Sequence, residues 1–299
     1  MLPPLSLAKI DVSEDEQDRL EKEEQQSQSF VSKIKRVLIP IHPGSSRALS
    51  SKLIGTLGQF HAIEATSLTL LKSDSELEEY ASRTLMESTK EGNVTLVNRM
   101  YKGDDHAGRV LEEARKNYDL VVLEPGRLGD DNHENPIIQE IARECVCPLL
   151  LVRESKQSPD WNIKHILIPT GAEGHTAKAV QLGIVLAKST GAKVTALAVV
   201  EKRKDYTRTM LQDDMKKELM AREMVDQVAA LASAFDVNVK SKVRSSSDHA
   251  SEILKVSEKL ECDLIILGGN IRPTSLLHFG DTASEILKRA KCHVAIVSN

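Results

Sequence analysis

Aromatic residues are scarce in this chain of 299 residues, at 3% of the sequence. That is too few to build a platform on which nucleic-acid bases stack. Positive charge is not in excess either, because 40 Lys and Arg residues stand against 44 Asp and Glu residues, which gives a formal net charge of -4. A nucleic-acid backbone is bound chiefly through positive charge. The composition therefore argues against nucleic acid as a partner.

Long apolar runs are also missing. Runs such as Leu149–Val152 are a fraction of the roughly 20 residues that span a bilayer. The N-terminus lacks the basic segment and apolar core of a secretory signal. We therefore expect no membrane span in this sequence and a cytoplasmic location.

Cysteine is rare, with four residues at positions 145, 147, 262 and 292. They form no C-x-x-C pair and have no histidine at zinc-site spacing. Cys145 and Cys147 would share one face of a strand at most. We expect reduced thiols and no metal site.

The first 33 residues differ from the rest, because they are acidic and poor in apolar side chains. Ser13 and Glu16 have the spacing of a capping box, which predicts the start of a polar helix. Without an apolar stripe that helix has no face to dock on a core. We interpret residues 1–33 as an acidic leader or linker helix.

Beyond this leader the sequence repeats itself. The spacing between the copies grows by about fifteen residues after the first matching pair, so the second copy carries an insertion, for which the charged stretch Lys202–Met224 is the candidate. The repeat predicts two domains, at 34–155 and 162–299. Four segments recur: Lys35–Pro40 as Lys164–Pro169, Asp105–Ala107 as Asp248–Ala250, Asp119–Leu123 as Asp263–Leu267, and Cys147–Val152 as Cys292–Val297.

Each copy alternates short apolar runs with amphipathic helical patterns, which is typical of a parallel sheet covered by helices on both faces. We count five strands per copy, and in such sheets ligands bind at the carboxyl ends of the strands. A long helix with a Met-rich stripe is expected near Met210–Phe235; it is either the domain's own second helix or a groove for a partner. The strands expected in the second copy are Ile166–Pro169, Val194–Val200, Val237–Val243, Leu264–Leu267 and Val294–Val297.

Taken together, the strand that ends in Ile-Pro, the Asp-His-Ala segment, the Asp-Leu-Ile-Ile-Leu-Gly strand and the closing Ala-x-Cys-x-Val-x-x-Val segment resemble the universal stress protein family, in tandem from about Lys33 onward. The resemblance implies a flavodoxin-like, Rossmann-like five-stranded α/β domain. It also implies pairing of the copies through their last strands. One branch of that family binds ATP and another does not.

The ATP-binding branch uses a Pro-x-Asp at the end of the first strand and a loop G-x2-G-x9-G-[S/T] before a helix. The resemblance therefore points to a weak nucleotide site in the second copy. Gly171 stands in place of the aspartate, and ten residues rather than nine separate Gly269 from Gly280. Asp281 either repels phosphate or serves as a helix N-cap. The site residues are Pro169, Thr170, Gly171, Gly268, Gly269, Asn270, Gly280, Asp281 and Thr282.

The first copy departs further from that pattern. Pro40–His42 also lacks the aspartate, and Asn135-Pro136 replaces the Gly-Ser of the loop. Proline removes an N–H donor, and acidic residues around it have the wrong sign for phosphate. We expect no ATP in this copy.

His106 and His249 each follow an aspartate at equivalent places, and a nucleophile could in principle use such a pair. We instead expect Asp105 and Asp248 to begin helices, with the histidines packing or capping. No G-x-S-x-G, H-E-x-x-H or Walker motif is present. We therefore expect no catalytic residue.

Three functions fit these residues. The first is a non-enzymatic regulatory or sensory module that takes ATP, AMP or a cyclic (di)nucleotide in its second domain. Because the acidic leader is similar to the arrangement in transporter tails, its partner would be a membrane transporter, a cation/proton antiporter or an amino-acid permease, in cis or in trans. The alternatives are a slow ATPase and a scaffold without ligand that forms homodimers through the strand edges at Cys147–Val152 or His293–Val297.

Overall fold

The computed structural model describes residues 30–41, 48–72, 92–124, 136–155, 162–171, 176–201, 208–269 and 280–298. The chain divides into two compact units. The first unit comprises the ranges 32–162 and 269–299, and the second comprises 163–268 with Phe30 and Val31. The predicted leader helix from Ser13 lies outside the described residues, of which the first are α2 (Phe30–Lys33).

The first unit contains six strands in the order β3-β2-β1-β4-β5-β10. Strands β1 to β5 pair in parallel, whereas β10 pairs antiparallel with β5, with Val294 opposite Arg153 and Val297 opposite Leu150. The helices here are α3 (Ala48–Leu57), α5 (His106–Ala114), α6 (Pro136–Glu144) and α10 (Asp281–Arg289). The strands are β1 (Arg36–Ile41), β2 (Ile63–Leu71), β3 (Val94–Lys102), β4 (Leu120–Leu123), β5 (Leu149–Arg153) and β10 (His293–Ser298).

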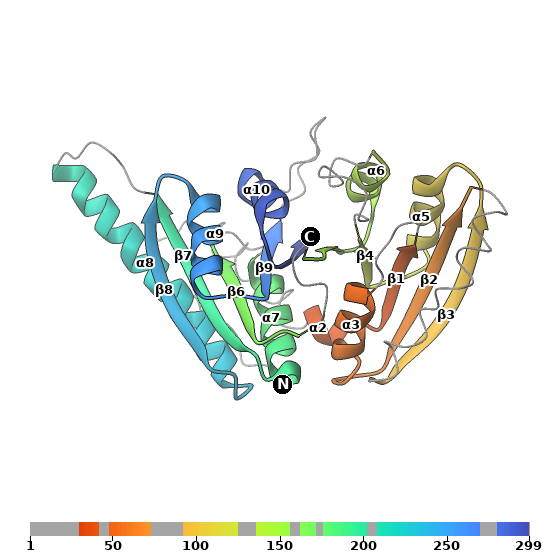
Figure 1. Ribbon diagram of the computed structural model, residues 1–299, viewed down its shortest axis with the longest axis horizontal. Helices are drawn as coiled ribbons and strands as arrows, with labels where there is room; N and C mark the ends of the chain where they lie inside the picture. Colours follow the sequence, from red (N-terminus) through yellow and green to blue (C-terminus); the bar gives the residue numbers. More distant parts are fainter. Residues whose placement is uncertain are drawn as a thin grey trace, which may run out of the picture. The chain divides into compact units, whose positions relative to one another are not determined.

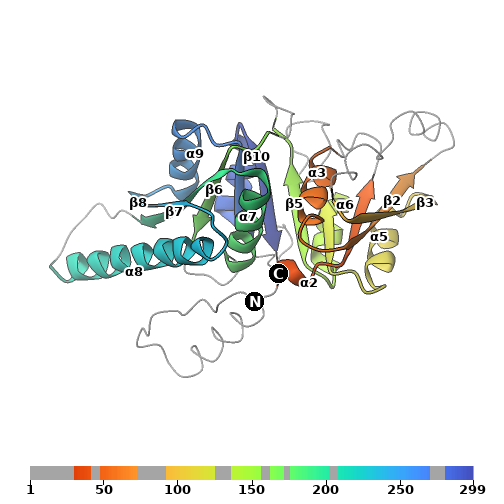
Figure 2. The same cartoon turned by 90° about the horizontal axis from the view of Figure 1, so that it is seen from below.

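The second unit has four parallel strands in the order β9-β6-β7-β8. Helix α8 covers one face of β7 and β8, and α9 lies on the opposite face (Figure 1, Figure 2). The strands are β6 (His165–Thr170), β7 (Lys193–Glu201), β8 (Val239–Ser246) and β9 (Leu264–Gly269), and the helices are α7 (Thr176–Thr190), α8 (Arg208–Ser233) and α9 (His249–Lys259).

Both the predicted α/β class and the five strands per copy are confirmed. The apolar runs become buried strands, and β4 and β10 are buried along their whole length. The pairing of β5 with β10 is the pairing of last strands that the resemblance implies. It also corrects one expectation, because the segments proposed as free edges for homodimers are hydrogen-bonded to each other within the chain.

The duplication is visible in one repeated polar contact. The side chain of Asp119 accepts hydrogen bonds from the backbone N–H groups of Lys35 and Arg36, at 2.9 and 2.8 Å. Asp263 does the same for Lys164 and His165, at 2.8 Å each. Each aspartate precedes the fourth strand of its copy and fixes the start of the first. The carboxylate therefore satisfies two donors that begin the central strand.

We expect the Asp263→Ala substitution to lower the free energy of unfolding by about 1–3 kcal/mol, because two backbone donors lose a charged acceptor. Urea denaturation measures this effect. The Asp226→Ala variant is the matched control, since Asp226 is an exposed residue of α8, and it should stay within about 0.5 kcal/mol of the parent. Equal effects of the two variants would show that the contact contributes nothing specific.

Helix α8 divides the predicted Met-rich stripe. Val225 and Val228 are buried against the sheet, whereas Met215 and Leu219 are 72% and 58% exposed. The helix is thus the domain's own second helix along its carboxyl-terminal part, as one of the two interpretations predicted. Within the described ranges, none of the helices combines the length and the apolar character that a membrane span requires.

Candidate functional site

The carboxyl ends of β6 and β9 lie at one edge of the second unit, because the two strands run parallel, with Ile166 opposite Leu264. This edge brings Thr170 and Gly171 of the sequence-predicted site near the end of β9, where Gly268 stands. The backbone of Gly171 is exposed, while Thr170 and Gly268 are half-buried. The Thr170 hydroxyl donates to the carbonyl oxygen of Leu197 at 3.4 Å. Pro169 precedes Thr170 within β6 and is also half-buried.

The remaining predicted residues begin α10 or end β9. Gly269 is the last residue of β9 and is buried, and Asn270 lies outside the described residues. Gly280 is the N-cap of α10 with φ 85°, a conformation that favours glycine. The interpretation of Asp281 as the N-cap is therefore wrong: Asp281 is the first residue of the helix, where its charge still favours the helix dipole. Thr282 follows it and is half-exposed.

In the first unit, the corresponding strand end is occupied by a side chain of the chain itself. Glu124 directly follows β4, and its carboxylate accepts the backbone N–H of Ser50 in the first turn of α3 at 2.7 Å. The first turn of a helix presents unpaired N–H groups and a partial positive charge, which attract anions. Glu124 therefore supplies an internal anion to α3.

The repeat places a glycine where the first copy has this glutamate. Asp119–Leu123 matches Asp263–Leu267, so Glu124 corresponds to Gly268. Gly268 has no side chain with which to reach α7, the counterpart of α3. Among the described residues the two copies thus differ at the strand end: Glu124 places a carboxylate there in the first copy, and Gly268 stands at its position in the second. The difference is visible when the two copies are aligned. Its consequence for the start of the helix follows only from the Glu124–Ser50 contact.

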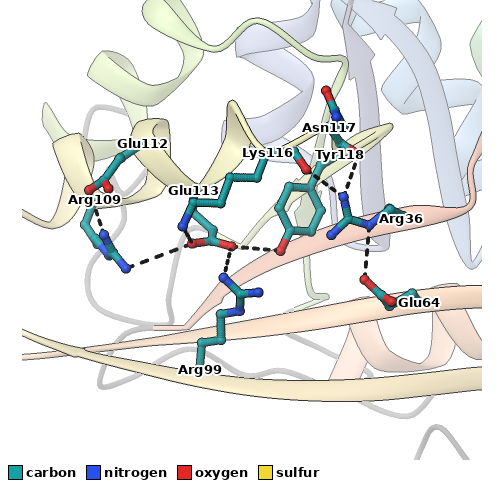
Figure 3. Close-up of polar contacts among 9 residues, drawn as sticks. All are labelled: Arg36, Glu64, Arg99, Arg109, Glu112, Glu113, Lys116, Asn117 and Tyr118. Atoms are coloured by element: carbon teal, nitrogen blue, oxygen red, sulfur yellow. Dashed lines mark hydrogen bonds and ion pairs between the residues drawn. The ribbon is translucent and has the colours of Figure 1, made fainter.

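A second polar cluster, which the sequence analysis missed, surrounds Glu113 of α5 (Figure 3). Its side chain is fully buried, and its carboxylate accepts from Arg99 at 2.6 Å, Lys116 at 2.8 Å and the Tyr118 hydroxyl at 3.0 Å. Arg109 lies 4.0 Å away. The pairs Arg109–Glu113 and Glu113–Lys116 were visible as helical spacings, whereas Arg99 comes from β3 and had no signal.

The charges of this cluster favour the ionised carboxylate. Burial alone would raise the pKa of Glu113, but the hydrogen bonds from Lys116 and Tyr118 and the positive charge of Arg99 hold that pKa below its usual value. Burial raises the pKa of Tyr118, and the Arg36 guanidinium stacks on its ring at 4.7 Å from the centroid. In the second copy the place of Glu113 is taken by Val256, which is buried. The cluster therefore belongs to the packing of the first copy.

The two histidines at equivalent positions of the repeat, His106 and His249, lie at the starts of helices, as expected. Asp105 accepts the backbone N–H of Gly108 at 2.9 Å, and Asp248 accepts that of Ser251 at 2.9 Å. The aspartates are thus the N-caps of α5 and α9. His106 is buried, and His249 is half-buried. Among the described residues, no three His, Cys, Asp or Glu side chains gather as a metal site.

Comparison with known proteins shows what the second half of the chain and the whole fold resemble. A profile of the Universal stress protein family matches residues 162–298. The fold is similar to that of a universal stress protein from Archaeoglobus fulgidus (15% identity, TM-score 0.57, 88% of this chain and 98% of that chain). It is also similar to a Pseudomonas aeruginosa protein of unknown function (14%, 0.59, 90% and 94%).

A third similar structure is the cytoplasmic domain of a prokaryotic cation chloride cotransporter (14% identity, TM-score 0.57, 88% of this chain and 95% of that chain). No curated protein sequence matches the chain. At such identities the solved structures establish the fold, and the profile shows a similarity of the second half to this family. Residues 162–298 thus match the universal stress protein family, and the flavodoxin-like fold of its solved members extends over both halves of the chain.

Proposed function

We propose that the protein is a non-enzymatic regulatory module that binds one adenine nucleotide in its second domain, at the carboxyl ends of β6 and β9. The ligand class is ATP, AMP or a cyclic (di)nucleotide. One observation carries this proposal: the carboxylate of Glu124 is bonded to the first turn of α3 in the first copy, while the corresponding residue of the second copy is Gly268. Of the two strand ends that the structure describes, we infer that the second is the one that takes an external ligand.

The chemistry of the strand end supports a phosphorylated ligand. Glu124 shows that a carboxylate suits the first turn of the helix after the first strand. A ligand phosphate or ribose hydroxyl would take the same role at α7, near Thr170 and Gly171. Helix α7 has no acidic residue in its first turn to compete with such a ligand. Because Gly268 has no side chain, a ligand can approach the backbone of this strand end closely.

Further parts of the proposal come from the sequence. From the loop pattern of the sequence alone we also include Gly280, Asp281 and Thr282 among the nucleotide-site residues, and we propose the domains at 34–155 and 162–299. Asp281 carries a negative charge at the start of α10, which disfavours triphosphates relative to ligands with fewer charges. We therefore expect AMP or a cyclic nucleotide to bind at least as tightly as ATP.

Isothermal titration of the purified chain with ATP, AMP, cyclic AMP and cyclic di-AMP tests this function. The expected result is saturable binding of at least one ligand with a stoichiometry near one per chain. Release of inorganic phosphate from ATP during the titration would instead support the slow ATPase. A folded chain that binds none of the four ligands would contradict the proposal and would favour the scaffold without ligand instead.

A membrane transporter is the partner we propose for this module. The supporting observation is the similarity in fold, over 88% of the chain, to the cytoplasmic domain of a prokaryotic cation chloride cotransporter. The expected result is that the native transcript encodes membrane-spanning segments in the same polypeptide or in a neighbouring reading frame. A transcript in which neither is present would count against a transporter partner.

A further inference from the structure

Two thiols face each other at the start of β5. Cys145 directly follows α6, Cys147 lies two residues later, and their Sγ atoms are 3.5 Å apart. Both cysteines are free thiols, and they lie in the turn before β5 rather than on a strand as the sequence suggested. Cys147 is buried, Cys145 is partly exposed, and Val146 between them is 73% exposed. The pair is thus accessible from one side, through Cys145.

The repeat shows that this pair is particular to the first copy. Cys147 corresponds to Cys292, and Cys145 corresponds to Ala290. Cys292 and Ala290 are both buried. The turn therefore folds with a single buried cysteine in the second copy, so packing does not require the second thiol. Cys145 adds a reactive group to a turn that is complete without it.

The contact also gives the two thiols different pKa values. The hydrogen bond with Cys147 outweighs burial and lowers the pKa of Cys145 to about 7, whereas the same bond together with burial raises the pKa of Cys147. The thiolate is the nucleophilic form of cysteine. Near neutral pH the partly exposed sulfur is therefore about half ionised, whereas the buried sulfur beside it keeps its proton.

We propose that Cys145 and Cys147 form a peroxide-sensitive thiol pair, in which Cys145 reacts with hydrogen peroxide and Cys147 resolves the product to a disulfide. The Cys145 thiolate attacks one peroxide oxygen, the O–O bond breaks, and hydroxide leaves as water after protonation. Cys147 then loses its proton and attacks Sγ of Cys145, and the sulfenic oxygen leaves as a second water. Two thiols are oxidised by two electrons, and the peroxide is reduced to two waters.

Mass spectrometry after mild hydrogen peroxide treatment tests the proposal. Trypsin releases both cysteines in one peptide, residues 144–153, because it cleaves after Arg143 and Arg153. The expected product is this peptide lighter by two hydrogens, restored by a dithiol reductant. Cys262 and Cys292, which are buried, should remain reduced under the same conditions. Without peroxide, Cys145 should be alkylated by iodoacetamide about tenfold faster than Cys262 at pH 7.

Two variants separate the roles. In Cys147→Ser, peroxide should leave a sulfenic acid on Cys145 that a dimedone probe captures. In Cys145→Ala, which copies Ala290 of the second half, Cys147 should resist peroxide. The proposal is overturned if wild-type Cys145 passes to sulfinic acid without a disulfide, or if Cys262 and Cys292 oxidise as fast as Cys145. Both readouts use the intact wild-type chain and do not depend on the variants folding.

Discussion

Replacing Glu113 with Gln is expected to lower the free energy of unfolding by about 2–3 kcal/mol at pH 7. The carboxylate is fully buried and accepts hydrogen bonds from Arg99, Lys116 and Tyr118. Gln keeps the shape but loses the charge that these donors pair with. In the variant, Arg99 and Lys116 regain part of their hydration, because they are 41% and 46% exposed. The loss of unfolding free energy therefore stays below that of a fully buried ion pair that loses one partner.

The pH dependence of this loss identifies its cause. Because the pKa of Glu113 is lowered in the folded chain, its contribution is present above the unfolded pKa of about 4.3 and disappears as the pH falls through the folded value. The difference between wild type and Glu113→Gln should therefore be largest near pH 7 and shrink below about pH 4.

Urea denaturation at a series of pH values measures both effects. Glu112→Gln is the matched control, because Glu112 is the neighbouring residue, is 60% exposed and pairs with Arg109. It should change the free energy of unfolding by less than about 0.5 kcal/mol. A loss in Glu113→Gln that stays constant from pH 7 to pH 3 would mean that packing, and not charge, explains the effect.

The Gly268→Glu substitution is expected to weaken nucleotide binding by at least about 100-fold. A like charge at a phosphate site costs several kcal/mol, and each tenfold loss of affinity corresponds to about 1.4 kcal/mol. The substitution gives the second copy the residue that the first copy has at Glu124. Its carboxylate would bond to the first turn of α7 as Glu124 bonds to Ser50. The variant should fold, since the first copy folds with the same residue.

Ala230→Glu is the control for this substitution. Ala230 is exposed on α8 and far in sequence from the strand ends, so it adds the same charge without touching the site. Calorimetric titration should give wild-type affinity for Ala230→Glu. Equal affinities for wild type and Gly268→Glu would place the ligand elsewhere in the chain. Equal losses in both variants would attribute the effect to net charge alone.

The sequence was sufficient to predict the architecture, for a physical reason. Buried parallel strands must be apolar along their length, so runs such as Leu264–Leu267 can be recognised from the sequence. The repeat then doubled the evidence for each element, and the N-caps Asp105 and Asp248 followed from the preference of Asp for helix starts.

What the sequence could not supply are contacts between elements distant along the chain. Arg99 and Glu113 come from β3 and α5, and Glu124 reaches Ser50 across 74 residues. Such pairs depend on where strands lie in the sheet, and no local spacing encodes them. The Cys145–Cys147 contact is local, but it depends on the turn, since a strand would have separated the thiols by a full pleat.

The most direct test of the claim that only one copy binds a nucleotide is amide hydrogen exchange with and without the ligand found by titration. The account predicts slower exchange in peptides that contain Thr170, Gly171 and Gly268, and unchanged exchange in those that contain Ile41 and Glu124, the equivalent strand ends of the first copy. Protection at both strand ends, or at the first copy alone, would contradict it.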